Sequence, residues 1–125
     1  MSKPLVYIIE DDHLMAELLA LNCRRAGAFP AIFGDAIAAI TAVSEQLPDL
    51  IFLDILLTGP DGFTFLHEMR SYQDTAKIPV IILTSLNLTA HQLSDYGVAK
   101  ILNKENFLPQ DIQKFVKEYT KNVGA

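Results

Sequence analysis

The sequence predicts an α/β fold in which five parallel strands form a sheet that helices cover on both faces. Three short, almost uninterrupted apolar runs carry this prediction: Leu5–Ile9, Leu50–Leu53 and Val80–Leu83. Because apolar residues are continuous in these runs rather than alternating, both faces of each strand are expected to be covered, as in a parallel sheet between helices. Segments of helical periodicity lie between the runs, and the connections are short, which favours repeated strand–helix units.

Two weaker apolar runs, Ala31–Phe33 and Val98–Leu102, complete the set of strands and are expected at the edges of the sheet. Lys100, in the second of these runs, is a charge of the kind that discourages pairing with another sheet edge. Right-handed crossovers with helices on both faces then give the strand order 2-1-3-4-5, which is the flavodoxin-like, doubly wound arrangement.

Five helices are predicted from apolar residues at helical spacing. The stripes of the first, second, third and fifth helices are Leu14, Leu18 and Leu21; Ala36, Ile40, Val43 and Leu47; Phe65, Met69 and Tyr72; and Ile112, Phe115, Val116 and Tyr119. Asp35 is the expected N-cap of the second helix, and Pro109 belongs to the first turn of the fifth. A short fourth helix is expected to begin at a capping box of Thr89 and Gln92 and to end at Gly97.

The length of 125 residues predicts one domain over residues 1–125, with no output domain in this chain. Half of the residues are apolar and a fifth are charged, which predicts that this domain folds around a core. The net charge of −5 argues against direct nucleic-acid binding, which needs clustered Lys and Arg. Cys23 is the only cysteine, so an internal disulfide is excluded and a small core residue is expected. The run Leu5–Ile9 is too short for a signal peptide or a membrane span, and we expect a cytoplasmic protein without a membrane partner.

Polar side chains follow four of the predicted strands, at the end of the sheet where ligands bind in doubly wound folds. They are Glu10 and Asp11, Asp54, Thr84 and Ser85, and Lys104. Carboxylates that are crowded together raise each other's proton affinity unless a cation lies among them, and Mg²⁺ takes such oxygen ligands. Asp54, at the end of a buried strand, is the best-placed nucleophile toward a phosphoryl group. Lys104 and the Thr84 hydroxyl would then stabilise the phosphoryl oxygens.

Other polar residues near this end of the sheet have simpler interpretations. Asp12 is a candidate cap of the first helix, and Asp61, before Gly62, is expected to be a turn and cap residue. The histidines, His13, His67 and His91, are expected at the surface.

Taken together, the sequence resembles the receiver domain of two-component response regulators over essentially its whole length. The matching stretches are Val6–Asp12, Leu53-Asp54 followed by Asp61-Gly62, Val80–Ser85, and Asn103-Lys104. The resemblance implies a conformational switch in a phosphorelay, in which a sensor histidine kinase or a histidine phosphotransfer protein phosphorylates Asp54. It implies no enzyme beyond self-catalysed phosphorylation and dephosphorylation of the aspartate.

The resemblance also assigns roles to other residues. Mg²⁺ would be held by Glu10, Asp11, Asp54 and the backbone carbonyl of Leu56. Thr84 and Lys104 would be the phosphate-sensing pair. Lys100 and Ile101 would lie on an output face that meets a downstream protein partner or a detached output domain.

Several positions depart from the receiver pattern. Thr58 and Glu105 stand where receivers usually have prolines, the second of them cis, and we expect a trans peptide bond before Glu105. Ile101 replaces the aromatic residue of the switch, so no ring can move there. Leu56 and Leu86 would overhang the acyl phosphate and exclude water, which predicts slow self-dephosphorylation.

Two other classes of protein remain open. A pseudo-receiver would keep the fold and signal by protein contacts alone, which Ile101 and Glu105 favour slightly and the complete acidic set opposes. Beryllofluoride or acetyl phosphate would discriminate the two. A flavodoxin would need a phosphate-binding loop after the first strand, and an aspartyl phosphatase usually has a second Asp where Leu56 stands, so both are disfavoured.

Overall fold

The computed structural model describes residues 3–57, 62–85, 93 and 96–123. Its elements are β1 (Leu5–Ile9), α1 (His13–Arg25), β2 (Phe29–Phe33), α2 (Ala36–Glu45), β3 (Leu50–Asp54), α3 (Gly62–Arg70), β4 (Val80–Thr84), β5 (Val98–Asn103) and α4 (Pro109–Thr120). The strands are all parallel and follow the order β2-β1-β3-β4-β5. This confirms the predicted flavodoxin-like fold.

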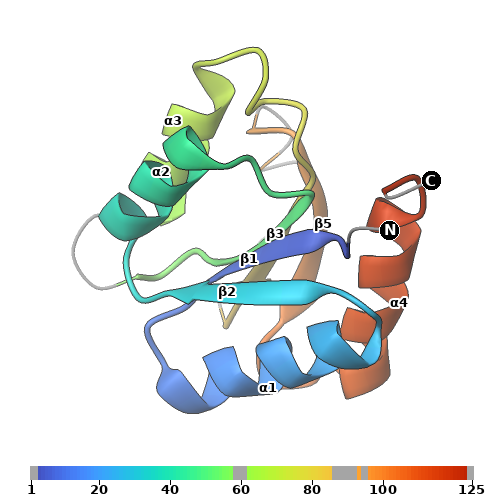
Figure 1. Ribbon diagram of the computed structural model, residues 1–125. Coiled ribbons are helices and arrows are strands. Elements are labelled where there is room, and N and C mark those ends of the chain that lie inside the picture. The colour runs from blue at the N-terminus through green and yellow to red at the C-terminus, as the bar shows by residue number, and fades with distance from the viewer. Residues whose placement is uncertain (1–2, 58–61, 86–92, 94–95, 124–125) are drawn as a thin grey trace.

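The described residues contain four helices where the sequence predicted five. Most of the predicted fourth helix, including its capping box of Thr89 and Gln92, lies outside the described residues, so α4 is the helix predicted as the fifth. Figure 1 shows α1 and α4 on one face of the sheet and α2 and α3 on the other. Each pair of helices covers its own apolar core.

The central strands are buried on both sides, which explains their continuous apolar sequences. β3 and β4 are buried at all five positions, whereas the edge strands β2 and β5 are only partly covered. The register between β4 and β5 shifts by one residue, because Val80 pairs with Val98 while the next residue, Ile81, pairs with Lys100. The extra residue places Lys100 toward α4, with its Nζ 5.9 Å from the Phe115 ring centroid.

The predicted N-terminal residues of α1, α2 and α4 are confirmed. The Asp35 Oδ1 accepts a hydrogen bond from the Ala38 N–H at 2.8 Å and caps α2. The Asp12 Oδ1 accepts hydrogen bonds from the Leu14 and Met15 N–H groups and caps α1. Pro109 is in the first turn of α4.

The predicted apolar stripe of α1 is wrong. Leu14 is 81% exposed and Leu21 is 42% exposed, so neither belongs to the core. The buried face of α1 is instead formed by Ala16, Leu19, Ala20 and Cys23. Leucines at helical spacing can lie on either face, and only packing against the sheet and α4 selects the buried one. Burial raises the pKa of the Cys23 thiol to about 12, as expected for an unreactive core cysteine.

Other predicted stripe positions lie beyond the observed helix ends. Leu47 follows α2 and Tyr72 follows α3, and both side chains are exposed. Among the described helices, none combines the length and the apolarity that crossing a bilayer requires.

The corrected face of α1 gives a stability test. Replacing Leu19, which is 1% exposed, by Ala should lower the free energy of unfolding by about 2–5 kcal/mol, because it removes buried methyl groups and leaves a cavity. The matched change Leu21→Ala should cost less than about 1 kcal/mol. Urea unfolding of both variants measures this difference, and equal losses would contradict the burial seen here.

Candidate functional site

The carboxyl ends of the central strands bring two buried carboxylates together. Asp54 is the last residue of β3 and only 4% exposed, and Glu10 directly follows β1 and is 2% exposed. The Glu10 N–H donates to the Phe33 carbonyl at 3.0 Å, which extends the pairing of β1 with β2 to this residue. Since β1 and β3 are parallel neighbours, the two side chains emerge at the same edge of the sheet.

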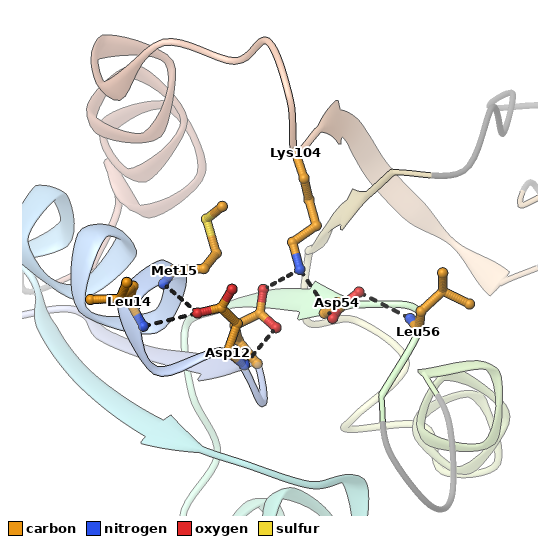
Figure 2. A network of polar contacts seen from close by, with 7 residues as sticks. Asp12, Leu14, Met15, Asp54, Leu56 and Lys104 are labelled. Carbon is orange, nitrogen blue, oxygen red and sulfur yellow. Dashed lines mark hydrogen bonds and ion pairs between the residues drawn. The ribbon is translucent and has the colours of Figure 1, made fainter.

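Lys104 supplies a positive charge between these carboxylates. Its Nζ lies 2.6 Å from Glu10 Oε1 and 3.2 Å from Asp54 Oδ2 (Figure 2). The Lys104 N–H donates to the Thr84 carbonyl at 3.0 Å, so the backbone pairing of β4 with the end of β5 fixes the start of the lysine side chain. The predicted convergence of Glu10, Asp54 and Lys104 is therefore seen in the structure.

Two backbone N–H groups orient the carboxylates further. The Leu56 N–H donates to Asp54 Oδ1 at 3.0 Å, and the Asp12 N–H donates to Glu10 Oε2 at 3.2 Å (Figure 2). Asp12 thus has two structural roles, because its side chain caps α1 while its backbone holds Glu10. Leu56 contacts the Asp54 carboxylate through its backbone N–H. The role of the Leu56 carbonyl as a metal ligand stays a prediction.

The electrostatics of the site follow from burial and from these contacts. Burial raises the pKa of Glu10 to about 7, and the Asp54 carboxylate adds to this, while the Lys104 ammonium opposes it. Burial alone would lower the pKa of Lys104, but the contacts with Glu10 and Asp54 outweigh it and the net pKa is raised. Lys104 therefore stays charged at neutral pH.

The acidic set fits a divalent cation. Glu10, Asp11 and Asp54 each offer a carboxylate oxygen, and these oxygens lie within 4.8 Å of one another. Glu10 and Asp54 are buried, and Asp11 is exposed at the entrance. A hard ion such as Mg²⁺ uses one or two carboxylates together with water and phosphate oxygens, and this donor set would supply carboxylates of that kind.

Thr84 and the remaining predicted residues occupy distinct surroundings. Thr84 is fully buried at the end of β4, next to Leu83, which pairs with Asp54 in the sheet, while Ser85 is exposed. On β5, Lys100 is exposed, and Ile101 is partly buried against the core between the sheet and the α2–α3 layer.

The departures from the receiver pattern are only partly visible. No cis peptide bond occurs among the described residues, which confirms a trans bond between Lys104 and Glu105. Thr58, Asp61 and Leu86 lie outside the described residues. His13 and His67 are exposed, as expected, and His91 also lies outside them.

Gly62 is a site residue whose importance the sequence did not reveal. Its N–H donates to the Ile55 carbonyl at 3.1 Å, and a Cβ atom here would lie 2.6 Å from Ile55 Cα and 2.9 Å from the Asp54 carbonyl oxygen. Only glycine permits this approach of α3 to the backbone that follows Asp54. The Asp61-Gly62 pair in the sequence indicated a turn. The close contact of Gly62 with the backbone of Asp54 and Ile55 could be found only in the tertiary structure.

A parallel α/β sheet with a buried aspartate, two further carboxylates and a lysine at its carboxyl edge is typical of receivers, the class that the sequence resembles. The family model of the response regulator receiver domain matches residues 6–117. The chain therefore belongs to the response regulator receiver domain family.

Relatives extend this assignment. The DNA-binding dual master transcriptional regulator RpaA of Synechocystis sp. is 33% identical over 120 residues, which cover 90% of this chain and 46% of that protein. The DNA-binding response regulator MtrA of Mycobacterium tuberculosis is 34% identical over 80 residues, or 64% of this chain and 34% of that protein. The chain thus spans less than half the length of these curated relatives.

A solved structure confirms the fold. The receiver domain of a sensor histidine kinase from Pseudomonas aeruginosa, with a magnesium ion coordinated in its active site cleft, has a TM-score of 0.84 and 21% sequence identity. The alignment covers 96% of this chain and 99% of that chain.

These relatives contradict the expectation of no direct nucleic-acid binding. RpaA and MtrA are DNA-binding regulators, and the net charge of −5 describes only the 125 residues present here. A charge argument on one segment says nothing about regions that the longer relatives possess beyond it.

The contact of Gly62 predicts a selective loss of stability. Gly62→Ala should lower the free energy of unfolding by about 1–3 kcal/mol, because the added methyl group meets backbone atoms that cannot move aside independently. Gly34→Ala is the matched control, since a Cβ there has nothing within 4 Å. Thermal unfolding compares them, and a neutral Gly62→Ala variant would contradict the close approach.

The raised pKa of Glu10 predicts that Mg²⁺ affinity depends on pH. Glu10 must lose its proton to bind metal, so affinity should rise by up to about tenfold per pH unit below 7 and level off above it. Glu10→Gln should bind Mg²⁺ more weakly but without this dependence. Titration calorimetry at several pH values measures both, and a flat profile for the unaltered protein would exclude Glu10 as the competing group.

Proposed function

We propose that Asp54 is phosphorylated by a histidine kinase or a histidine phosphotransfer protein, with Mg²⁺ held by Glu10, Asp11 and Asp54. The observation that supports this most directly is the position of Asp54, buried at the end of a central strand between a backbone N–H and an ammonium group. Neighbouring groups thereby fix the direction of its carboxylate before any donor arrives.

The transfer needs little from the protein besides positioning and charge. A carboxylate oxygen of Asp54 attacks phosphorus and forms an acyl phosphate, while the phosphorus–nitrogen bond of the donor phosphohistidine breaks and its electron pair returns to the imidazole. When bound, Mg²⁺ would neutralise charge on the phosphoryl oxygens. Lys104, which already contacts Asp54 Oδ2, would stabilise the same oxygens after small movements of its side chain.

Thr84 is proposed to report the modification. Its position at the end of β4, beside the strand that carries Asp54, is compatible with donation of its hydroxyl to a phosphoryl oxygen. With Ile101 in place of an aromatic residue, the response on β5 cannot be the movement of a ring, and it would spread through Lys104 and the β5 backbone toward Lys100.

The chemistry proposed is self-catalysed phosphorylation and dephosphorylation of Asp54, without a separate substrate. The Leu56 side chain is 50% exposed beside the acceptor and has no polar atom that could orient an attacking water. This supports a slow loss of the phosphoryl group. Leu86, the other leucine from which slow self-dephosphorylation was predicted, lies outside the described residues.

We also propose that residues 1–125 form one receiver domain whose output is exerted elsewhere. The curated relatives are DNA-binding regulators that are more than twice as long as the segment they share with this chain. A switch that controls DNA contacts made outside residues 6–117, in the same chain or in a partner, is the output that these relatives support. Lys100 and Ile101 are the proposed output face.

A pseudo-receiver remains the second candidate. It is favoured by Ile101, which is packed partly into the core and cannot act as a mobile ring, and by the trans Lys104–Glu105 bond. A pseudo-receiver would bind neither beryllofluoride nor a phosphoryl group.

Mass spectrometry after incubation with acetyl phosphate and Mg²⁺ tests the proposal. The unaltered protein should gain the mass of one phosphoryl group, and Asp54→Ala should gain none because it lacks the nucleophile. Glu118→Gln, which removes an exposed carboxylate of α4, should be labelled normally. Labelling of Asp54→Ala would refute the acceptor, and a failure of the unaltered protein to respond to either acetyl phosphate or beryllofluoride would favour the pseudo-receiver.

A further inference from the structure

A second concave site lies at the opposite end of the sheet from Asp54. Since α2 and α3 run antiparallel to the strands, their C-terminal ends meet at the amino edge of the sheet (Figure 1). Between them is a cavity of about 340 Å³. Its apolar walls are formed by Ile40, Val43, Leu47, Met69 and Tyr72. This volume falls within the range of pockets that bind small organic ligands, roughly 300–1,000 Å³.

Two of the apolar residues that line the cavity are exposed. Leu47 and Tyr72 were predicted as core positions of α2 and α3, yet both lie past the helix ends with exposed side chains. They extend the apolar surface of the cavity outward from Val43 and Met69, which are buried at its base.

The charge around this cavity is negative. Glu45, Glu68 and Asp74 line it, and none of its described lining residues is basic. α2, which is described over its full length, has no basic side chain in its last turn. α3 ends with His67 and Arg70, but these two side chains line a different cavity with Ser71 and Tyr96. The carbonyl groups at the C-terminus of a helix carry partial negative charge, so the end of α2 adds to the field of the carboxylates.

Hydrogen bonds hold the walls of the cavity in place. The buried Tyr7 hydroxyl donates to the Gln46 carbonyl at 2.7 Å and fixes the end of α2 to β1. The Thr75 hydroxyl donates to the Met69 carbonyl and ties the loop after α3 to its helix. Burial and, secondarily, the charge of Glu45 raise the pKa of Tyr7. The cavity is therefore formed before any ligand arrives.

We propose that this cavity binds an organic cation, an ammonium or guanidinium compound with an apolar body. The apolar body would pack against Val43, Met69 and Tyr72, and the cationic group would lie beside Glu45, Glu68 and Asp74. An anion of the same shape would meet three carboxylates and a helix C-terminus, and a neutral apolar ligand would gain nothing from them. This site is independent of the phosphorylation proposed for Asp54.

Amide NMR of the whole chain, titrated with phenethylammonium chloride, tests the proposal. We expect saturable shifts at Val43–Leu47 and Met69–Thr75, and weaker binding as salt is added. Phenylpropionate, which has a similar body with the opposite charge, should bind at least about tenfold more weakly.

Two triple variants with equal changes of net charge separate the local field from the overall charge. Glu45→Gln with Glu68→Gln and Asp74→Asn should weaken binding of phenethylammonium roughly tenfold. Glu17→Gln with Glu105→Gln and Glu118→Gln, which alters exposed acids elsewhere, should leave it within about twofold. Equal binding of phenylpropionate, equal losses in both triple variants, or no saturable shift would overturn the proposal. Shifts of the cavity amides on dilution without probe would assign the cavity to a second copy of the chain and also overturn it.

Discussion

Two carboxylates, those of Glu10 and Asp54, lie buried at the carboxyl edge of the sheet and share a single ammonium group. Burial of two such charges is unfavourable unless opposite charge and hydrogen bonds compensate for the lost water. The opposite charge comes from Lys104, whose Nζ lies 2.6 Å from Glu10 Oε1 and 3.2 Å from Asp54 Oδ2. Two backbone N–H groups, those of Asp12 and Leu56, donate the hydrogen bonds. The compensation is incomplete, because the pKa of Glu10 remains raised, and a further cation bound beside the carboxylates would reduce the remaining repulsion.

The architecture around this cluster can be understood as the means of placing it. Parallel strands direct their carboxyl ends to one edge, and the order β1-β3-β4-β5 makes the strands that carry the acids and the lysine a continuous series. The register shift in β5 and the hydrogen bond from the Lys104 N–H to the Thr84 carbonyl set where the lysine begins. Gly62 allows α3 to approach the backbone of Asp54 and Ile55 closely.

The two ends of the sheet are both acidic but differ in chemistry. At the carboxyl edge the acids are central and largely buried, and they meet a lysine and backbone donors. At the amino edge the acids surround apolar walls without a basic partner among the described lining residues. The first arrangement suits a hard metal ion and a phosphoryl group, and the second suits an organic cation. Because the two proposed sites lie at opposite ends of the sheet, their proposed ligands would not compete for the same position.

The sequence by itself determined the strand order of the sheet and placed Glu10, Asp54 and Lys104 together at one edge of it. Continuous apolar runs identify buried parallel strands, and the residues that directly follow such strands must lie at one edge, so Glu10, Asp54 and Lys104 could be grouped without coordinates. The caps Asp12 and Asp35 were also predictable, because they depend on contacts within a few residues. The buried face of α1 was not, since Leu14, Leu19 and Leu21 differ only in what packs against them. The partner of Lys104, the close approach of Gly62 and the cavity between α2 and α3 likewise depend on residues far apart in the chain, whose distances only the packed structure fixes.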